Sequence, residues 1–276
     1  MDNKSKWRQV LHQKPSYYLP ILFLSLLFLL AVFAFLIPID PNATDVSSMS
    51  QAPGGKHLFG TDEIGRDYFI RVIYGGRISL LVGVLAMIAS TFIGTLVGLI
   101  AGYYGGVVDS LLMRFVDILS SIPWLVLVIV LSVLLKPGLV TIIFVIGVFS
   151  WMNIARLIRA ETLSVKQREY VIYAQFIGVK DHMIIRKHIL PAVLSTLIVA
   201  ATGSISGAIM TESALSFLGI GIQPPVASWG SLLQNAQGSL QQAPHMALIP
   251  GICIILTVYS FNSLGNYLRE VVLLEG

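Results

Sequence analysis

The chain has little charge and almost no cysteine. Of its 276 residues only 12% are Asp, Glu, Lys or Arg, whereas 55% are hydrophobic. The one cysteine, Cys253, lies in an apolar run, which excludes a disulfide or a cysteine-rich metal site within this chain. The mean hydropathy of +0.81 exceeds that of a soluble domain and predicts a membrane protein.

Motifs for nucleotide binding and hydrolysis are also missing. There is no GxxxxGK[ST] phosphate loop, because the nearest string, Gly54-Gly55-Lys56, lacks the first glycine and the final hydroxyl. No HExxH, CxxC or GxSxG occurs, and the five histidines are scattered along the chain. The cations are not interleaved with aromatics in a patch, so we expect no nucleic-acid binding. We expect neither an enzyme nor a resident cofactor or metal.

Long apolar runs are what the sequence does contain. About 20 apolar residues suffice to cross a hydrocarbon core of about 30 Å. The first run is too long for a cleaved signal peptide and lacks a small-residue cleavage site, so we expect it to be retained. The sequence predicts an all-α membrane protein with six transmembrane helices: Tyr17–Ile37, Ile78–Gly102, Ser110–Leu135, Leu139–Ile158, Val193–Met210 and Ala247–Leu264.

Charge bias orients these spans. If the N-terminus is cytosolic, most of the 18 Lys and Arg residues fall in inner segments, as the positive-inside rule requires. The N-terminal cations Lys4, Lys6, Arg8 and Lys14 and the basic loop around Arg168 then share one side. We therefore expect both termini and this loop to be cytoplasmic.

A polar stretch between the fourth and fifth spans, KQREYVIYAQFIGVKDHMIIRKHILP, carries helical spacing. Tyr170, Tyr173, Ala174 and Ile177 lie at i, i+3, i+4 and i+7 and predict an apolar stripe on a short helix that faces the cytosol. Gly178 follows where a left-handed C-cap would end that helix. We expect Asp181 to cap a second short helix and Pro191 to begin the next span. An apolar stripe on a cytosolic loop indicates a partner protein.

The spacing of Ala174, Gly178, Leu190 and Pro191 resembles the cytoplasmic "EAA" loop of permease subunits of ATP-binding-cassette importers. In that family the loop is a coupling helix that docks into a groove on the ATPase subunit. Ile172 and Tyr173 stand where the family consensus has Glu and Ala, so no carboxylate role is carried over to them. The resemblance implies that ATPase coupling depends on Glu169, Tyr170, Tyr173, Ala174, Ile177, Gly178, Leu190 and Pro191.

Two more strings narrow the resemblance. HLFGTDEIGRDYFIRVIYGGRISL, before the second span, and ESALSFLGIGIQPPVASWGSLL, after the fifth, are similar to segments of the oligopeptide, dipeptide and nickel branch of these permeases. The resemblance implies a type I importer permease fold in a bacterial cell membrane, in contact with lipid. Its segments would be a cytoplasmic 1–16, a first transmembrane helix 17–38, an external loop 39–77, a permease core 78–266 and a cytoplasmic tail 267–276.

The same resemblance implies an assembly and a cargo. The expected partners are a homologous second permease subunit, two ATPase subunits that hold ATP and Mg, and an extracytoplasmic solute-binding protein that delivers substrate near Gln223–Gln242. The expected cargo is a dipeptide or oligopeptide, with nickel or a metal chelate as the alternative. A self-sufficient secondary transporter or channel would need inverted repeats and charges within its spans, whereas we find no clear repeat and nearly charge-free spans.

The fifth span is unusually polar. Its hydroxyls can bond across helices or line a wet passage, and an ionisable group at membrane depth indicates a functional site. We expect Glu212 near the outer boundary, where water can reach it, and favour a helix cap or an ion pair as its role, with contact to the substrate as the alternative. The pathway candidates are Ser206, Thr211, Glu212 and Ser213.

Other spacings predict local contacts. Gly94, Gly98 and Gly102 repeat at four residues, which favours close helix packing within the subunit or between subunits. We expect Arg114 to pair with Asp117 at i, i+3, and Pro123 to kink the third span. In the first external loop we expect Asp62 and Glu63 to pair with Arg66, and Asp67 with Arg71.

Overall fold

The computed structural model describes residues 10–273, so Lys4, Lys6 and Arg8 of the topology argument lie outside it, as do residues 274–276. Almost all of the described chain is helical, and its β pairing is limited to one isolated bridge between Thr61 and Asp67. The α-helices are α2 (Tyr18–Phe33), α3 (Tyr68–Tyr104), α4 (Gly106–Ser121), α5 (Trp124–Leu134), α6 (Leu139–Phe149), α7 (Trp151–Lys166), α8 (Glu169–Phe176), α9 (Asp181–Ile184), α10 (Leu190–Phe217), α11 (Trp229–Ala236) and α12 (His245–Leu273).

Five helical stretches of the described chain are long and apolar enough to cross a membrane, and a sixth span results if the bent pair α4 and α5 is counted as one. The five are Pro15–Leu36, Tyr68–Tyr104, Leu139–Lys166, Asp181–Phe217 and His245–Val272. The bend between α4 and α5 is 81°. Pro123 lies at this break, as predicted, because proline cannot continue the hydrogen bonding of α4.

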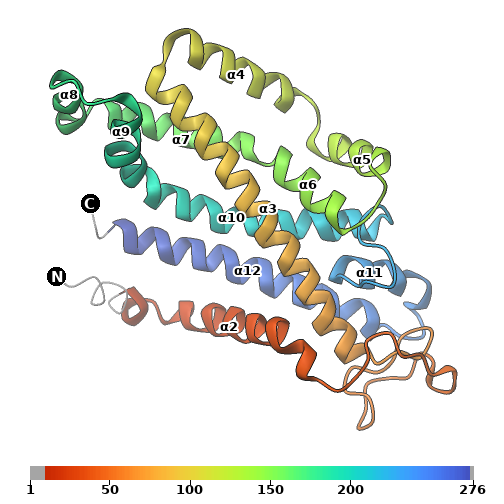
Figure 1. The fold of residues 1–276 in the computed structure, drawn as a ribbon. Coiled ribbons are helices and arrows are strands. Elements are labelled where there is room, and N and C mark those ends of the chain that lie inside the picture. The colour runs from red at the N-terminus through yellow and green to blue at the C-terminus, as the bar shows by residue number, and fades with distance from the viewer. Residues whose placement is uncertain (1–9, 274–276) are drawn as a thin grey trace.

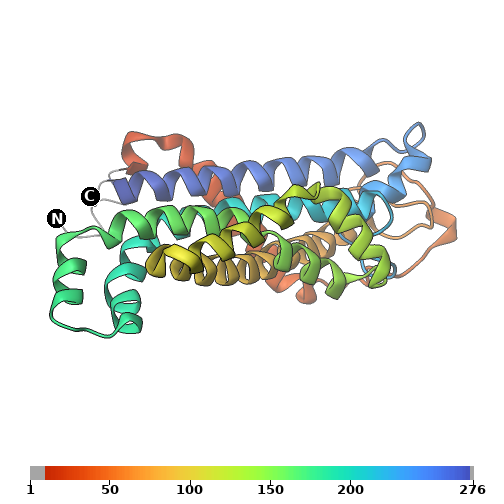
Figure 2. The ribbon, with the colours of Figure 1, turned by 90° about the horizontal axis from the view of Figure 1, so that it is seen from above.

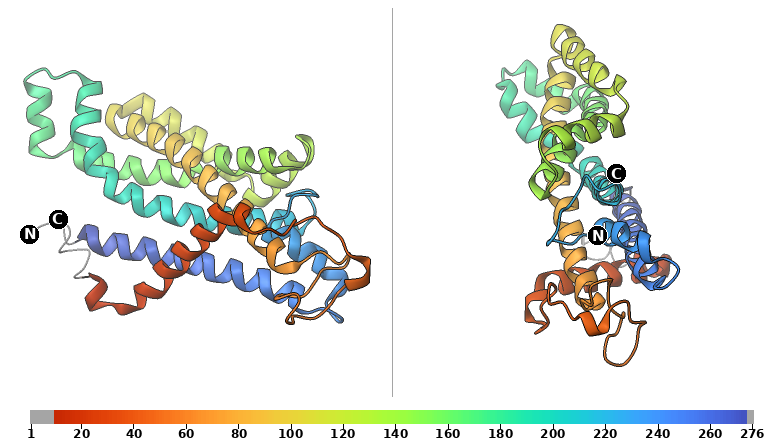
Figure 3. Two further views of the ribbon diagram at one scale, coloured as in Figure 1. Left: turned by 60° about the horizontal axis from the view of Figure 1, so that its bottom comes forward. Right: turned by 90° about the vertical axis from the view of Figure 1, so that its right-hand side faces the viewer.

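The helices run back and forth between two ends of the bundle (Figure 1). The start of α2, the end of α12 and the α8–α9 hairpin lie at one end, whereas α11 and the long loop before α3 lie at the other. Seen from above, the α8–α9 hairpin projects beyond the bundle (Figure 2). The two further views show the same separation of the hairpin from the loop-rich end (Figure 3).

Helix α3 starts earlier than expected and crosses the bundle obliquely (Figure 1). It begins at Tyr68 and not near Ile78, because the Asp67 carboxylate caps it by accepting from the backbone N–H of Ile70 at 3.2 Å. Its 37 residues span about 55 Å at 1.5 Å per residue, more than the hydrocarbon thickness. The loop before α3 therefore ends at Asp67, ten residues before the end of the predicted segment 39–77.

The glycines of α3 pack against α7, so the within-subunit alternative holds. A Cβ on Gly94 would lie 2.7 Å from Ile154 Cβ, one on Gly98 would lie 2.7 Å from the carbonyl oxygen of Ala155, and one on Gly102 would lie 2.6 Å from Thr162 Cβ. Only glycine permits this approach, and close backbone contact is how helices associate where lipid supplies no hydrophobic drive.

Two ion pairs join α4 to α7. The Asp117 carboxylate accepts a hydrogen bond from Arg156 Nη2 at 2.9 Å, and the Asp109 carboxylate accepts one from Arg159 Nη2 at 2.6 Å. The predicted pairing of Asp117 with Arg114 is therefore wrong. The partner of Asp117 is instead Arg156 of the neighbouring helix α7. Residue spacing within α4 alone cannot reveal a partner that lies on another helix.

Candidate functional site

The turn after α8 has the geometry that its sequence predicts. Gly178 adopts φ +78°, its N–H donates to the Gln175 carbonyl at 3.1 Å, and the N–H of Val179 donates to the Ala174 carbonyl at 3.1 Å. This pair of bonds is a Schellman motif, which needs a left-handed residue after the helix. The predicted C-cap at Gly178 is confirmed, and it makes α8 and α9 a compact hairpin.

Asp181 does not cap the second helix. The residue before α9 is Lys180, and Asp181 is the first residue of α9. Its carboxylate instead accepts from the Tyr103 hydroxyl at 2.7 Å, so it ties the hairpin to the last turn of α3. On the other side of Tyr103, the Lys166 ammonium donates to the Tyr103 carbonyl and lies 5.4 Å from its ring centroid. Tyr103 therefore joins α3, the end of α7 and the hairpin.

Pro191 lies in the first turn of α10, as predicted, but α10 is not separate from the hairpin. Helix α9, a π-helical turn at Ile185–Ile189 and α10 follow one another without a break. In regular α-geometry the proline ring would clash with the carbonyl of Lys187, and a wider turn just before the proline relieves that clash. The hairpin is thus continuous with α10, and the start of α10 at Leu190 directly follows this local widening.

The predicted apolar stripe on α8 is split between two sides of the helix. Ala174 is only 5% exposed, and with the fully buried Val171 it packs into a cluster that includes Tyr103 and Ile158 of the spans. Our expectation that Ala174 faces the cytosol is therefore wrong. An eight-residue helix lying on the bundle must bury one face, and the pair at i and i+3 supplies it.

The outward side of α8 is strongly apolar. Phe176 is 88% exposed and Tyr173 65%, the two highest values among the large apolar residues of this helix. Ile172, Ile177 and Tyr170 extend the same exposed surface, whereas Glu169 lies in the first turn, where an acid suits the helix dipole. Sequence reasoning missed Phe176 and Ile172 because they fall outside the stripe. Contiguous exposed apolar side chains mark a protein or membrane interaction site.

The helix bundle contains a cleft of about 690 Å³. It is bordered by the bend at Pro123, by Ser150 at the junction of α6 and α7, and by the side of α10 that carries Gly203, Gly207 and Thr211. A Cβ on either glycine would meet no atom within 4 Å, so this side of α10 is open. Of the four pathway candidates, Thr211 lines the cleft.

The other candidates do not line it. Ser206 is buried and faces the Val258 carbonyl of α12 at 3.4 Å. Glu212 is fully buried, which contradicts our expectation that water reaches it. It accepts from Ser216 Oγ at 2.7 Å, from Ser79 Oγ at 2.9 Å and from Ser213 Oγ at 3.5 Å. Within the described chain no Lys, Arg or His lies within ion-pair distance of this carboxyl, so the expected ion pair is also wrong.

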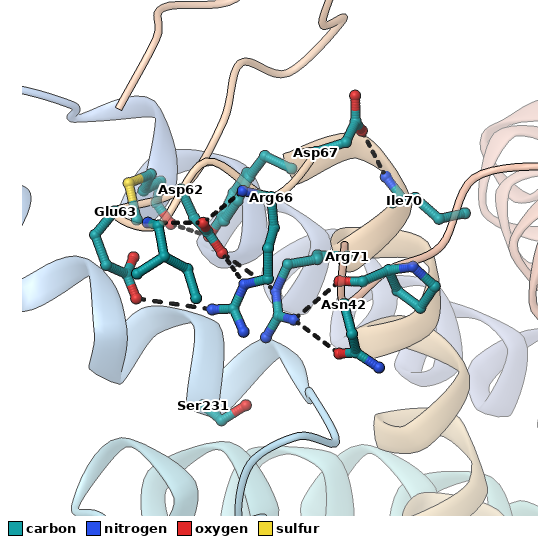
Figure 4. A network of polar contacts seen from close by, with 12 residues as sticks. Asn42, Asp62, Glu63, Arg66, Asp67, Ile70, Arg71 and Ser231 are labelled. Atoms are coloured by element: carbon teal, nitrogen blue, oxygen red, sulfur yellow. Dashed lines mark hydrogen bonds and ion pairs between the residues drawn. The ribbon is translucent and has the colours of Figure 1, made fainter. Parts of the chain in front are cut away.

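At the opposite end from α8, an ionic network organises the loop before α3 (Figure 4). The Asp62 carboxylate accepts from Arg66 Nε at 2.6 Å, and Arg66 Nη2 lies 3.8 Å from Glu63, as predicted. Arg71 turns to Asp62 at 3.5 Å and donates to the Pro41 carbonyl at 3.1 Å (Figure 4). The predicted pairing of Asp67 with Arg71 is wrong, because the Asp67 carboxylate is used to cap α3.

In the same loop, Asp45 is held by hydroxyl and backbone donors. Its carboxylate accepts from Ser47 Oγ at 2.6 Å and from Ser48 Oγ at 2.7 Å. These hydrogen bonds favour the ionised form and lower the pKa of Asp45 to about 2. The loop therefore has its own polar framework outside the spans.

These features define a polytopic helical membrane protein with an open cleft and an exposed apolar hairpin at one end. Comparison with known proteins gives the family. The model of the binding-protein-dependent transport system inner membrane component matches residues 94–272. The chain belongs to this family.

Curated relatives and solved structures agree with this assignment. The chain is 39% identical to the oligopeptide transport system permease protein OppC of Haemophilus influenzae over 98% of this chain and 89% of that one. It is 42% identical to the dipeptide permease DppC of Bacillus subtilis over 88% and 77%, and 38% identical to the glutathione permease GsiD of Pectobacterium atrosepticum over 96% and 88%. An inward-facing structure of the MetNI methionine ABC transporter matches with a TM-score of 0.60 at 19% identity, over 72% of this chain and 95% of that one, which shows a shared fold.

Proposed function

We propose that this permease subunit forms half of the translocation pathway for dipeptides or oligopeptides in an ATP-driven importer. The observation that carries the proposal is the exposed apolar face of α8, led by Phe176, on a hairpin continuous with the spans. The peptide class is supported by relatives named for oligopeptide, dipeptide and glutathione transport, each of which is a peptide. Nickel or a metal chelate has no comparable support.

The proposed assembly contains a homologous second permease subunit, two ATPase subunits that bind ATP and Mg, and an extracytoplasmic solute-binding protein. Hydrolysis belongs to the ATPase subunits and not to this chain. The α8 end of the bundle faces the cytosol together with both termini, and the loop-rich end faces outward. The cation bias of the sequence and the common end of α2, α8 and α12 in Figure 1 support this orientation.

Coupling follows from how the hairpin is attached. Only Gln167 and Arg168 separate α7 from α8, and α9 continues into α10 through the π turn. A partner that displaces α8 therefore moves α7 and α10 with it, because both are rigid helices joined directly to the hairpin. Helix α10 borders the cleft with Thr211, so motion at the cytosolic end changes the shape of the pathway.

The test replaces Phe176 by Ser. Because Phe176 is 88% exposed and supports no packing within the subunit, Phe176→Ser should insert and fold normally. We expect the ATPase subunits to co-purify at one tenth of the parental amount or less, since losing a buried aromatic anchor at an interface costs about 2 kcal/mol or more. Uptake of a labelled dipeptide into vesicles containing the complex should fall in proportion.

The matched control is Val140→Ser. Val140 is 79% exposed at the start of α6 (Leu139–Phe149), and the whole of α7 separates that helix from the hairpin, so this substitution should leave co-purification and uptake at parental levels. Normal ATPase binding and uptake by Phe176→Ser would refute α8 as the coupling surface. Uptake of a labelled nickel chelate but not of dipeptide by the parental complex would replace the peptide assignment.

A further inference from the structure

Two hydroxyl relays converge on Glu212, one from the loop 218–228 and one from the start of α11. Ser216 Oγ donates to Glu212 Oε1 at 2.7 Å and accepts from the backbone N–H of Ile222 at 3.0 Å. Ser79 Oγ donates to Glu212 Oε2 at 2.9 Å and accepts from the backbone N–H of Trp229 at 3.3 Å. The carboxyl group thus holds the first half of the loop, at Ile222, through one serine, and the residue that follows the loop, Trp229, through another.

The relays lie in a closed site. Glu212, Ser79 and Ser216 are each 0% exposed, so water does not replace a lost hydrogen bond. A buried polar group without a partner carries its full desolvation cost, and members of a buried network depend on one another. Removing the carboxyl therefore leaves both serine hydroxyls without their acceptor at once and weakens both attachments, whereas removing one serine breaks only one attachment.

Glycines bring the outer segment close enough for these relays. A Cβ on Gly230, the second residue of α11, would lie 2.6 Å from Ser213 Cα, and one on Gly76 of α3 would lie 2.7 Å from the Trp229 ring. Trp229 is 1% exposed, and its Nε1 donates to the Val72 carbonyl at 3.0 Å. The start of α11 therefore packs closely against both α3 and α10, next to the buried carboxyl of Glu212.

We infer that Glu212 is a positioning residue that holds the loop 218–228 and the start of α11 in the shape that receives a peptide-loaded solute-binding protein. The inference rests on the proposed function, which places this end of the bundle outside. Because Glu212 and Ser216 lie on α10, which continues from the hairpin, the same carboxyl connects the outer segment to a helix that moves with the hairpin. Glu212 acts through the loop and does not contact the transported peptide in the cleft.

The experiment uses the assembled importer in lipid vesicles, with ATP hydrolysis measured against increasing peptide-loaded binding protein. For Glu212→Ala we expect the half-saturating concentration of binding protein to rise about tenfold, equivalent to about 1.4 kcal/mol, with basal hydrolysis unchanged. Ser79→Ala and Ser216→Ala should each give a smaller rise. Glu212→Gln keeps one acceptor oxygen and should restore part of the affinity.

Thr257→Ala is the matched control, because its fully buried hydroxyl donates within α12 to the Cys253 carbonyl and touches neither relay. It should show parental half-saturation. Unchanged half-saturation in the Glu212 and both serine variants would overturn the inference, as would a fall in maximal rate alone. If Glu212→Ala does not assemble, the two serine variants decide the question. A parental complex that loaded binding protein does not stimulate would refute the proposed function itself, which separates the two failures.

Discussion

Close packing of α3 on α7 should make Gly98 intolerant of any side chain. A Cβ at Gly98 would lie 2.7 Å from the Ala155 carbonyl oxygen, 2.9 Å from Ile158 Cβ and 3.0 Å from the Arg159 backbone nitrogen. Two of these atoms are backbone, so the clash is relieved only by moving α7. Gly98→Val is the perturbation, and Gly251→Val on α12 is its control, because a Cβ there meets nothing within 4 Å.

The magnitude comes from the contact and not from helix propensity. Gly and Val differ by only a few tenths of a kcal/mol in a helix interior, and that difference is common to both variants. Overpacking costs about 1–3 kcal/mol for extra methylenes, and valine adds three carbons at Gly98. We therefore expect Gly98→Val to destabilise the subunit by at least about 2 kcal/mol relative to Gly251→Val.

The assay is thermal unfolding of the purified complex in detergent, read by its loss of monodispersity. A difference of about 2–4 °C in Tm is expected for each kcal/mol in a chain of this size. ATP hydrolysis stimulated by binding protein should weaken as well, because α7 leads into the hairpin that we propose couples to the ATPase. Equal Tm values for the two valine variants would refute the reasoning that α3 and α7 meet at these glycines.

Three further predictions concern the hairpin and the topology. Tyr103→Phe removes the hydrogen bond from the Tyr103 hydroxyl to Asp181, so uptake per ATP hydrolysed should fall about twofold or more while ATPase co-purification is retained. An unchanged ratio of uptake to hydrolysis would show that Tyr103 does not transmit motion between α3 and the hairpin. Ala174→Arg buries an unpaired charge and should destabilise the subunit by more than about 2 kcal/mol, seen as a lower Tm before any docking defect; a parental Tm would contradict its burial. Single cysteines at Arg168 and Gln237, in a background with the native cysteine changed to serine, should be respectively protected from and labelled by an impermeant thiol reagent in intact cells, and the reverse pattern would invert the proposed orientation.

Features that depend on near neighbours in the chain were predictable from the sequence. The apolar runs specify helices long enough to cross a membrane, and Pro123 breaks the third span because of its own ring and missing N–H. Gly178 ends α8 because only a residue that tolerates a left-handed backbone completes the Schellman turn. The family assignment likewise agrees with strings and spacings that need no tertiary information.

Tertiary packing decided which partner each polar group takes. Asp67 has Arg71 one turn away, yet its carboxylate caps α3, and Arg71 reaches back to Asp62. Asp117 pairs with Arg156 of another helix. Several partners are available to each group within the chain, and the choice among them depends on which helices lie alongside.

Burial was the least predictable property, as Ala174 and Glu212 show. Helical spacing groups residues onto one side of a helix but does not say whether lipid, water or protein covers that side. In a membrane protein the ambiguity is greater, because lipid and the protein interior are similarly apolar and hydrophobicity does not separate them. The buried side of α8 and the serine-lined site around Glu212 exist because α3, α7, α10 and α11 come together in space, which no local pattern encodes.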